Sequence, residues 1–357
     1  MRHAYITQDE IRAWLKEDDE ARLEDLWRRA DAVRREHVGD DVHLRGLVEF
    51  SNRCVRQCAY CGLRAGNRKL VRYRMSEAEI MDCARQAIAC GYGTVVLQSG
   101  EDPGIEMDWM AALIRRIRSE TPLVVTLSLG EQPEKDLSAW REAGADRYLL
   151  KFETSNKRLY ERLHPPLKGK SGDRIAMLHT LRDIGYETGS GTMVGLPGQT
   201  FEDVVEDVEL FRGLDLDMIG IGPYIPHLNT PLGRNAQRVR ACDGEQVPNT
   251  DQMTCKVVAL ARIVCPAANI PSTTALATLN PTEGRELGLM RGANIVMINI
   301  APLQYRVHYE IYPSRMSESD EAIRHRILTI GRKIGVGRGD SPNRLRRVRS
   351  VNAAGKI

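Results

Sequence analysis

The sequence lacks several features that would place the protein in a common class. Its 357 residues contain no run of about twenty apolar residues, the length that crosses a bilayer. The first residues, Met1–Tyr5, lack the apolar core of a secretory signal peptide. The formal net charge is only +3, although 28% of the residues are charged, so a basic nucleic-acid-binding surface is not indicated. We therefore expect a cytoplasmic protein that works on neither a membrane nor a nucleic acid.

Cysteine is scarce outside one stretch. The chain has 8 cysteines, and none follows Cys265. A disulfide framework is not expected in a chain of this size. Five cysteines are scattered among apolar or helical stretches and are expected to be buried as small hydrophobic residues. These are Cys83, Cys90, Cys242, Cys255 and Cys265.

The other three cysteines lie together, with the spacing C-x3-C-x2-C, directly after an apolar run at 47–50. Three closely spaced thiolates suit an iron–sulfur cluster in which one iron has no protein ligand, whereas a structural zinc site needs four ligands. The sequence predicts one [4Fe–4S] cluster on Cys54, Cys58 and Cys61, and hence a reducing cytosol. The alternatives are a zinc knuckle or three unrelated buried cysteines.

Short apolar runs alternate with helical patterns along most of the chain. Eight runs predict strands, near residues 45–51, 94–98, 123–128, 147–152, 188–194, 217–223, 268–274 and 294–299. The helical segment 76–90 begins with a capping box, Ser76 with Glu79. Eight strands alternating with helices predict an α/β protein with a (β/α)8 TIM barrel. We expect an N-terminal helical cap of two helices at 1–40, the barrel at 41–310, and a C-terminal helical extension at 311–357, with a helix at 319–334 and a solvated basic tail from 344.

Polar residues gather where the predicted strands end, which is where barrel enzymes carry their chemistry. Residues 98–101 follow the second strand and combine a glycine, which allows close approach of a ligand, with an acid that can accept a hydrogen bond from an ammonium group. Glu153 follows the fourth strand, and Arg174 comes soon after it. Arginine is suited to bidentate carboxylate recognition. In the alternative, residues 98–101 form a turn followed by a helix cap; Arg174, taken alone, is more often a surface residue.

Several segments resemble a known superfamily. The cysteine spacing, with the aromatic Tyr60 before the last cysteine, resembles the signature of radical S-adenosylmethionine (SAM) enzymes. The segments that narrow the resemblance to the [FeFe]-hydrogenase maturase family HydE are, in order, CAYCGLR, YRMS, VLQSGEDP, VTLSLGE, AGADRYLL, ETSN, GYETGSGTMVGLPGQT, MIGIGPYIPH, NIPSTTA and RGANIVM. Biotin synthase and methylornithine synthase share the barrel, the SAM and the first cluster, but GPYIPH is more similar to HydE.

The resemblance implies a radical SAM barrel with two cofactors, one [4Fe–4S] cluster and SAM. In the superfamily the open iron chelates the amine and carboxylate of SAM, and one electron from the cluster cleaves SAM to methionine and a 5′-deoxyadenosyl radical. Residues 99–101 resemble the GGE motif that holds the SAM amine, with Ser99 in place of the first glycine. The residues assigned to SAM in this way are Tyr60, Gln98, Ser99, Gly100, Glu101, Glu153, Arg174 and Met193.

The resemblance also implies a substrate, an iron dicarbonyl cyanide held by cysteine, which HydE converts toward the diiron site of the hydrogenase. We expect a small anion of this kind in a polar pocket at the far end of the barrel, opposite the cluster. Its predicted wall consists of Thr126, Ser128, Thr273, Thr274, Tyr305 and Arg306. In the alternative, these hydroxyls bond only to neighbouring backbone. The implied partners are a reductant such as ferredoxin or flavodoxin and other hydrogenase maturases.

Two departures from HydE and two alternative functions stay open. No cysteine after Cys265 is available for the second cluster of some HydE proteins, and Lys151-Phe152 stand where HydE often has Arg-His. Lys151 keeps the charge but not the planar fork of arginine. The chain could instead be a radical SAM enzyme acting on a small organic substrate, such as an amino-acid mutase or a sulfur-inserting enzyme. A non-catalytic iron–sulfur carrier or sensor would not need Glu101 and Glu153.

Overall fold

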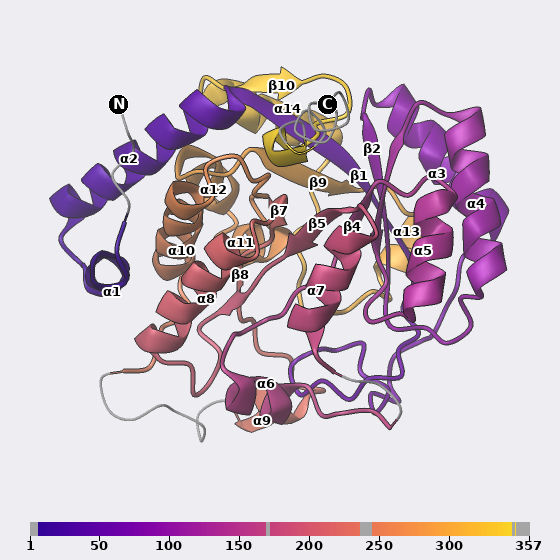
Figure 1. Cartoon of the computed structure of the whole chain (residues 1–357), viewed down its shortest axis with the longest axis horizontal. Coiled ribbons are helices and arrows are strands. Elements are labelled where there is room, and N and C mark those ends of the chain that lie inside the picture. The colour runs from indigo at the N-terminus through magenta and orange to yellow at the C-terminus, as the bar shows by residue number, and fades with distance from the viewer. Residues whose placement is uncertain (1–5, 169–171, 236–244, 345–346, 348–357) are drawn as a thin grey trace, which may run out of the picture.

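The computed structural model describes residues 6–168, 172–235, 245–344 and 347. In this part of the chain, parallel strands form one curled sheet with helices around it (Figure 1). The strands of this sheet are β1 (Asp41–Ser51), β2 (Thr94–Ser99), β3 (Val124–Ser128), β4 (Arg147–Leu149), β5 (Glu187–Ser190), β7 (Met218–Ile219), β9 (Ile295–Asn299) and β10 (Lys333–Gly335). A separate pair consists of β6 (Met193–Val194) and β8 (Gly222–Pro223).

Helices alternate with the strands along most of the described chain, as predicted. The Ser76–Glu79 capping box that begins α3 is confirmed. The helices are α1 (Gln8–Lys16), α2 (Glu20–Val38), α3 (Glu77–Ala89), α4 (Met107–Glu120), α5 (Glu134–Glu142), α6 (Lys157–Leu163), α7 (Arg174–Asp183), α8 (Phe201–Gly213), α9 (Pro231–Asn235), α10 (Asp251–Val264), α11 (Thr274–Leu279), α12 (Gly284–Met290), α13 (Leu303–Arg306) and α14 (Asp320–Thr329).

The sheet closes into a barrel through one stretch that is not a regular strand. The strands β1 to β5 pair in order, β7 follows β5, and β9 pairs with β1. Residues 268–272 bridge the gap, because the Asn269 amide donates to the Asp217 carbonyl at 2.8 Å and the Ser272 amide donates to the Ile295 carbonyl at 2.9 Å. The barrel is confirmed. The strand predicted at 268–274 is corrected to isolated bridges, since Pro271 has no N–H to extend a ladder.

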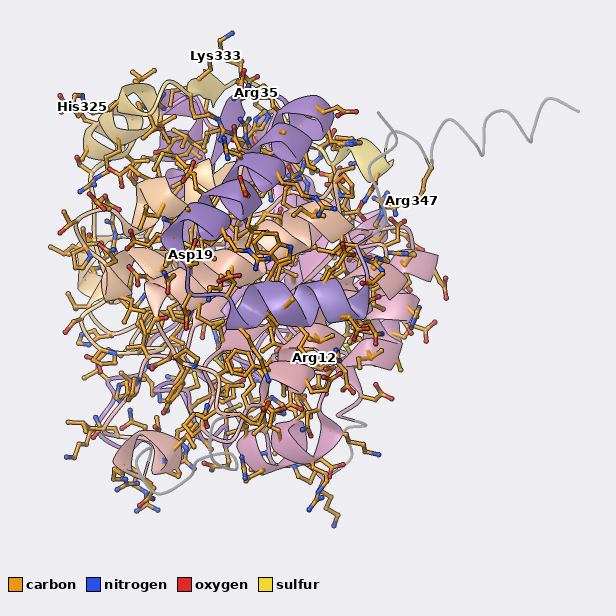
Figure 2. The ribbon with its side chains drawn as sticks, turned by 90° about the vertical axis from the view of Figure 1, so that its left-hand side faces the viewer. Arg12, Asp19, Arg35, His325, Lys333 and Arg347 are labelled. Atoms are coloured by element: carbon orange, nitrogen blue, oxygen red, sulfur yellow. The ribbon has the colours of Figure 1, made fainter. Side chains whose placement is uncertain are left out.

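The two predicted N-terminal helices are confirmed, and they cover the outer helices of the barrel. Thr7 caps α1 and Asp19 caps α2. The helix α1 packs on α8, and α2 packs on α10. Figure 2 views the molecule from this side, with Arg12 on α1 and Arg35 on α2 labelled. Among the described helices, none combines the length and apolar character that a membrane crossing requires. The domain limits at 40 and 310 stay predictions.

The C-terminal region departs from the single helix predicted at 319–334. The helix α14 ends at Thr329, and β10 then pairs in parallel with Asp41–His43 of β1. Gly331 has φ +72°, a left-handed conformation that glycine adopts at little cost and that commonly ends a helix. The chain after 310 therefore contributes a strand to the barrel sheet.

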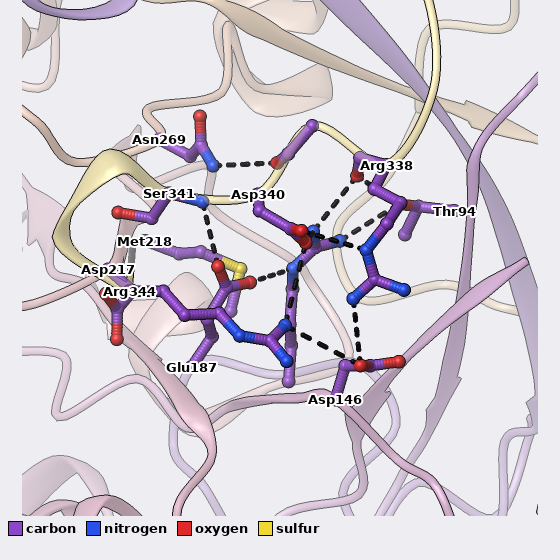
Figure 3. A network of polar contacts seen from close by, with 12 residues as sticks. Thr94, Asp146, Glu187, Asp217, Met218, Asn269, Arg338, Asp340, Ser341 and Arg344 are labelled. Atoms are coloured by element: carbon purple, nitrogen blue, oxygen red, sulfur yellow. Dashed lines mark hydrogen bonds and ion pairs between the residues drawn. The ribbon is translucent and has the colours of Figure 1, made fainter. Parts of the chain in front are cut away.

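Residues 338–343 then fill the N-terminal end of the barrel (Figure 3). Arg147 on β4 is fully buried and forms ion pairs with Glu187 on β5 and with Asp340 of this segment. The Ser341 amide donates to Glu187 at 2.8 Å, and the Arg338 carbonyl accepts from the Thr94 hydroxyl at 3.0 Å. The segment thus connects β2, β4 and β5 at the end of the barrel away from the cysteines.

The basic tail starts in contact with the barrel and not in solvent as predicted. Arg344 lies 3.6 Å from a carboxylate oxygen of Asp146, and Arg347 pairs with Asp215 and Asp217. These contacts arise because the three acids stand at the N-terminal ends of strands. Residues 338–343 cover this end of the barrel, so the basic residues that follow them lie close to the acids. Residues 345–346 and 348–357 of the predicted tail lie outside the described residues, as do 236–244.

Candidate cofactor and substrate site

A cavity of about 300 Å³ lies at the carboxyl ends of the barrel strands. The three clustered cysteines line it, and so does Ser128 from the predicted substrate wall. The residues predicted to contact SAM all line this cavity as well: Tyr60, Gln98, Ser99, Gly100, Glu101, Glu153, Arg174 and Met193. The barrel therefore brings together segments that are spread over more than a hundred positions of the sequence.

The cysteine loop follows β1 and is fixed by its backbone. The Val55 amide donates to the Glu101 carbonyl at 3.0 Å. A Cβ on Gly100 would lie 2.3 Å from the carbonyl oxygen of Arg53, so only glycine allows the loop to pass this close to the end of β2. Cys58 is buried, and burial raises the pKa of its thiol to about 12. Burial also raises the pKa of Cys54 and Cys61.

A buried charge cluster fastens this loop to the barrel. Arg56, which lies between the first two cysteines, contacts Glu101 at 2.7 Å and Glu131 at 2.6 Å. Arg174 of α7 contacts the same carboxylates at 3.6 and 3.1 Å. Buried carboxylates require such partners, and here two cations balance two anions. Gly130, with φ +74°, leaves room for Glu101, because a Cβ there would lie 2.1 Å from Cγ of Glu101.

His164 completes this cluster as a neutral ring. Burial lowers the pKa of His164 to about 2, and the neighbouring Arg174 and Arg56 add to this effect. The neutral ring accepts a hydrogen bond from Arg174 at 2.7 Å. Arg174 also donates to the Lys151 carbonyl at 2.7 Å, so its donors already serve the protein. Its assignment to the SAM carboxylate stays a prediction.

Glu153 is the acid of the cavity that has fewer charged partners than Glu101. Its ion-pair partner is Lys151 at 3.5 Å, and its Oε2 is buried without a hydrogen bond from the described residues. Its backbone has φ +67°, a left-handed conformation that costs a non-glycine residue about 1–3 kcal/mol and that clusters at functional sites. The fold thus maintains a strained residue at the wall of the cavity.

Comparison with known proteins decides the family. The pattern of the radical SAM superfamily matches residues 48–211. The [FeFe] hydrogenase maturase subunit HydE of Thermotoga maritima is 44% identical over 92% of this chain and 92% of its own length. This chain belongs to the HydE family of radical SAM enzymes. The 3-methylornithine synthase of Methanosarcina acetivorans is 29% identical over 82% of this chain and 79% of its own.

Solved structures agree with this fold. The crystal structure of methylornithine synthase superposes with a TM-score of 0.80 at 25% identity, covering 93% of this chain and 95% of that one. The crystal structure of the maturase HydG superposes with a TM-score of 0.76 at 20% identity, covering 92% of this chain and 72% of that one. The second likeness concerns the fold alone.

The site fits the two cofactors of the radical SAM family, a [4Fe–4S] cluster and SAM. Cys54, Cys58 and Cys61 would hold the cluster in this HydE-family chain. Burial raises the pKa of all three thiols, so their thiolates need a nearby positive charge. The iron of a cluster would supply this charge. In the same cavity, the Glu153 carboxylate would offer an acceptor for the ammonium group or the ribose of SAM. The structure-based assignment of the individual SAM contacts remains a prediction.

A second cavity, of about 510 Å³, lies beside the first, and Tyr309 and Tyr312 line both. We call it the inner chamber, although it opens to solvent where the exposed Leu228 and Leu303 line it. Thr274 and Arg306 of the predicted substrate wall line it, together with Asn299 at the end of β9. The predicted position at the far end of the barrel is therefore wrong. The inner chamber lies at the same end as the cysteines, since Asn299 at the carboxyl end of β9 lines it and it shares Tyr309 and Tyr312 with the cofactor cavity.

The remaining predicted wall residues do not line the inner chamber. The Thr273 hydroxyl donates to the Ile221 carbonyl at 3.1 Å and caps α11, which is the alternative considered for such hydroxyls. The Tyr305 hydroxyl donates to Glu79 of α3 at 2.7 Å, because its ring packs on Tyr73. Thr126 is buried within β3, and its hydroxyl has no hydrogen-bond partner among the described residues.

Charged residues that the sequence did not indicate shape the inner chamber. Arg315 pairs with the fully buried Glu49 of β1 at 2.7 Å, and Arg285 pairs with Glu318 at 2.5 Å. Glu49 could have been noticed as an acid inside an apolar strand. Arg306 lies within 4 Å of no carboxylate among the described residues, and burial lowers its pKa. A bound anion would offset this unpaired charge.

We expect that Glu153→Gln weakens SAM binding without weakening the fold. Loss of one charge-assisted hydrogen bond costs about 1.5–3 kcal/mol, equivalent to about a ten- to hundredfold rise in the SAM dissociation constant. Calorimetric titration of SAM into cluster-loaded protein measures this change. Glu161→Gln, an exposed change on α6, serves as the control. Unchanged SAM affinity with a lower melting temperature would assign Glu153 a structural role instead.

Proposed function

We propose that this chain cleaves SAM reductively and acts on a small anionic iron complex during assembly of the [FeFe]-hydrogenase active site. The complex is an iron dicarbonyl cyanide held by cysteine. The HydE relative supports the place in hydrogenase maturation. The observation that carries the anionic substrate is Arg306, a half-buried cation in the inner chamber without a carboxylate partner among the described residues.

The arrangement of the two cavities supports radical chemistry. When bound, the cluster and SAM supply a reactive alkyl radical by one-electron cleavage of the sulfonium. The residues of the chain supply position and exclusion. Tyr309 and Tyr312 stand where the two cavities meet, so a substrate beside them lies next to the cofactor cavity. Residues 338–343 fill the N-terminal end of the barrel and limit the access of water from that end. A reactive intermediate requires a site from which water is excluded.

Two further parts of the proposal concern the surroundings of the enzyme. A reductant such as ferredoxin or flavodoxin must supply one electron for each SAM cleaved, and other hydrogenase maturases must deliver or accept the complex. A cluster with an open iron is oxygen-sensitive, which favours the reducing cytosol. Incubation of the protein with each reduced donor, followed by measurement of 5′-deoxyadenosine, tests the first part.

A second candidate function is a radical SAM reaction on an amino acid. The likeness to 3-methylornithine synthase favours it, as do paired acids and arginines in the inner chamber, which suit a zwitterion. The rate of 5′-deoxyadenosine formation decides between the candidates. Acceleration by the cysteine-held iron complex supports our proposal. Acceleration by an amino acid alone would contradict it.

We expect that Arg306→Ala spares the slow SAM cleavage seen without substrate but abolishes the acceleration by the iron complex. The reason is that Arg306 lines the inner chamber and does not line the cofactor cavity. Arg306→Lys, which keeps the charge, should retain part of the acceleration. Equal loss of both activities in Arg306→Ala would show that the residue supports SAM and not the substrate.

A further inference from the structure

The loop that carries Glu153 is held by a hydrogen-bonded chain that ends at a buried acid. The Glu153 amide donates to the Gly191 carbonyl at 3.0 Å, and the Glu153 carbonyl accepts from the Met193 amide at 3.0 Å. The Thr192 hydroxyl lies 2.7 Å from the same Glu153 carbonyl. These contacts fasten the left-handed residue to the segment between β5 and β6.

Thr192 has one hydroxyl proton but two close oxygen neighbours. Its Oγ1 lies 2.7 Å from the Glu153 carbonyl oxygen and 2.6 Å from Oδ2 of Asp207 on α8. If Asp207 were ionised, both neighbours would be acceptors, and one of the two short contacts would have no proton. If Asp207 is protonated on Oδ2, it donates to Thr192, and Thr192 donates to Glu153. Only this arrangement satisfies both contacts.

The surroundings of Asp207 also favour the neutral acid. Its side chain is fully buried, and its Oδ1 accepts from the Ser155 amide at 2.5 Å. The charged group acting on it is Asp203, one turn earlier on α8, whose carboxylate accepts from Asn156. The groups that face Asp207 from other elements, Ser155 and Thr192, are uncharged. Burial has the largest effect and raises the pKa of Asp207 to about 7; the like charge of Asp203 adds to this effect, and hydrogen bonds with Thr192 and Ser155 oppose it.

We propose that Asp207 is a positioning residue that, as a neutral acid, acts through Thr192 to hold Glu153 in the conformation that faces SAM. The inference rests on the proposed function in one respect, the contact between Glu153 and SAM. Asp207 is buried and does not line the cofactor cavity. Ionisation of Asp207 draws the Thr192 proton toward the carboxylate, and the Glu153 carbonyl then loses its side-chain donor.

The test compares the wild type with Asp207→Asn, because an asparagine donates to Thr192 and accepts from Ser155 at every pH. SAM is titrated into cluster-loaded protein between pH 6 and 8.5. We expect similar dissociation constants at pH 6 and about three- to tenfold weaker binding by the wild type at pH 8.5, the effect of one hydrogen bond. The amino group of SAM also titrates near this range, but it affects both proteins equally. A ratio that stays constant with pH would overturn the proposal.

Stability gives a second measurement that does not involve SAM. The folded-state pKa of Asp207 lies above its ordinary value of 3.8, so its contribution to stability is full below about pH 4 and is lost as the pH rises through about 7. The free energy of unfolding of the wild type, relative to Asp207→Asn, should therefore fall between about pH 4 and 7 and then level off. A difference that does not change with pH contradicts a titrating Asp207.

Two variants separate this inference from the proposed SAM contact. Glu153→Gln should lower SAM affinity at every pH and keep the pH-dependent stability difference, because Asp207 still titrates. If Glu153→Gln binds SAM like the wild type, the SAM contact fails, whereas the stability result still judges Asp207. Thr192→Val removes the connection, so adding Asp207→Asn to it should not change SAM affinity at pH 8.5. A gain in the double variant would contradict the route through Thr192.

Discussion

Replacement of Cys58 by alanine is expected to remove the cluster and with it all SAM cleavage. Cys54, Cys58 and Cys61 line one cavity, and each is predicted to be the ligand of one iron. With two cysteines left, the iron content of anaerobically reconstituted protein should fall from about four per chain to near zero. Iron and sulfide analysis, together with measurement of 5′-deoxyadenosine, checks this.

A matched control for this change is Cys90→Ala. Cys90 lies at the C-cap of α3, and it does not line the cofactor cavity. The control should keep its iron, sulfide and SAM cleavage. Near-normal iron and intact SAM cleavage in Cys58→Ala would contradict the cluster assignment. Loss of iron in both variants would point to a general folding defect, which the melting temperature of the apoprotein detects.

Arg147→Ala should cause the largest loss of stability among the changes considered. Arg147 and Glu187 are both fully buried, and Asp340 is the second partner of the arginine. Removal of the cation leaves Glu187 charged and buried, which typically costs 3–5 kcal/mol, or about half of a typical domain's stability. It also releases the segment that fills the N-terminal end of the barrel. Denaturant unfolding of the apoprotein measures the loss.

Two comparisons test this explanation. The double change Arg147→Met with Glu187→Leu removes both charges and should cost less than Arg147→Ala, because no buried charge is left unpaired. Arg116→Ala breaks two exposed ion pairs of α4, with Glu77 and Glu120, and should leave the unfolding free energy nearly unchanged. If Arg147→Ala behaved like Arg116→Ala, the network in Figure 3 would contribute little to stability.

The sequence by itself determined the cluster loop and the barrel. The three cysteines lie within eight positions, so their spacing alone brings the ligands together. The alternation of strands and helices is also local, and a capping box such as Ser76 with Glu79 acts over three residues. The residues predicted to contact SAM line one cavity for a related reason. Most of them lie at or after the carboxyl ends of strands, and parallel strands place these ends at one face of the barrel.

Only the tertiary structure decided how the charges are paired and where the hydroxyls point. Arg315 and Glu49 are 266 positions apart, and no local pattern connects them. The same holds for Asp340 and Arg147, which meet only because the chain returns to the N-terminal end of the barrel after β10. Thr273 and Thr274 are neighbours in sequence, yet one caps α11 and the other lines the inner chamber. Side-chain direction depends on the backbone angles of each residue and on its packing, and the three-dimensional fold sets both.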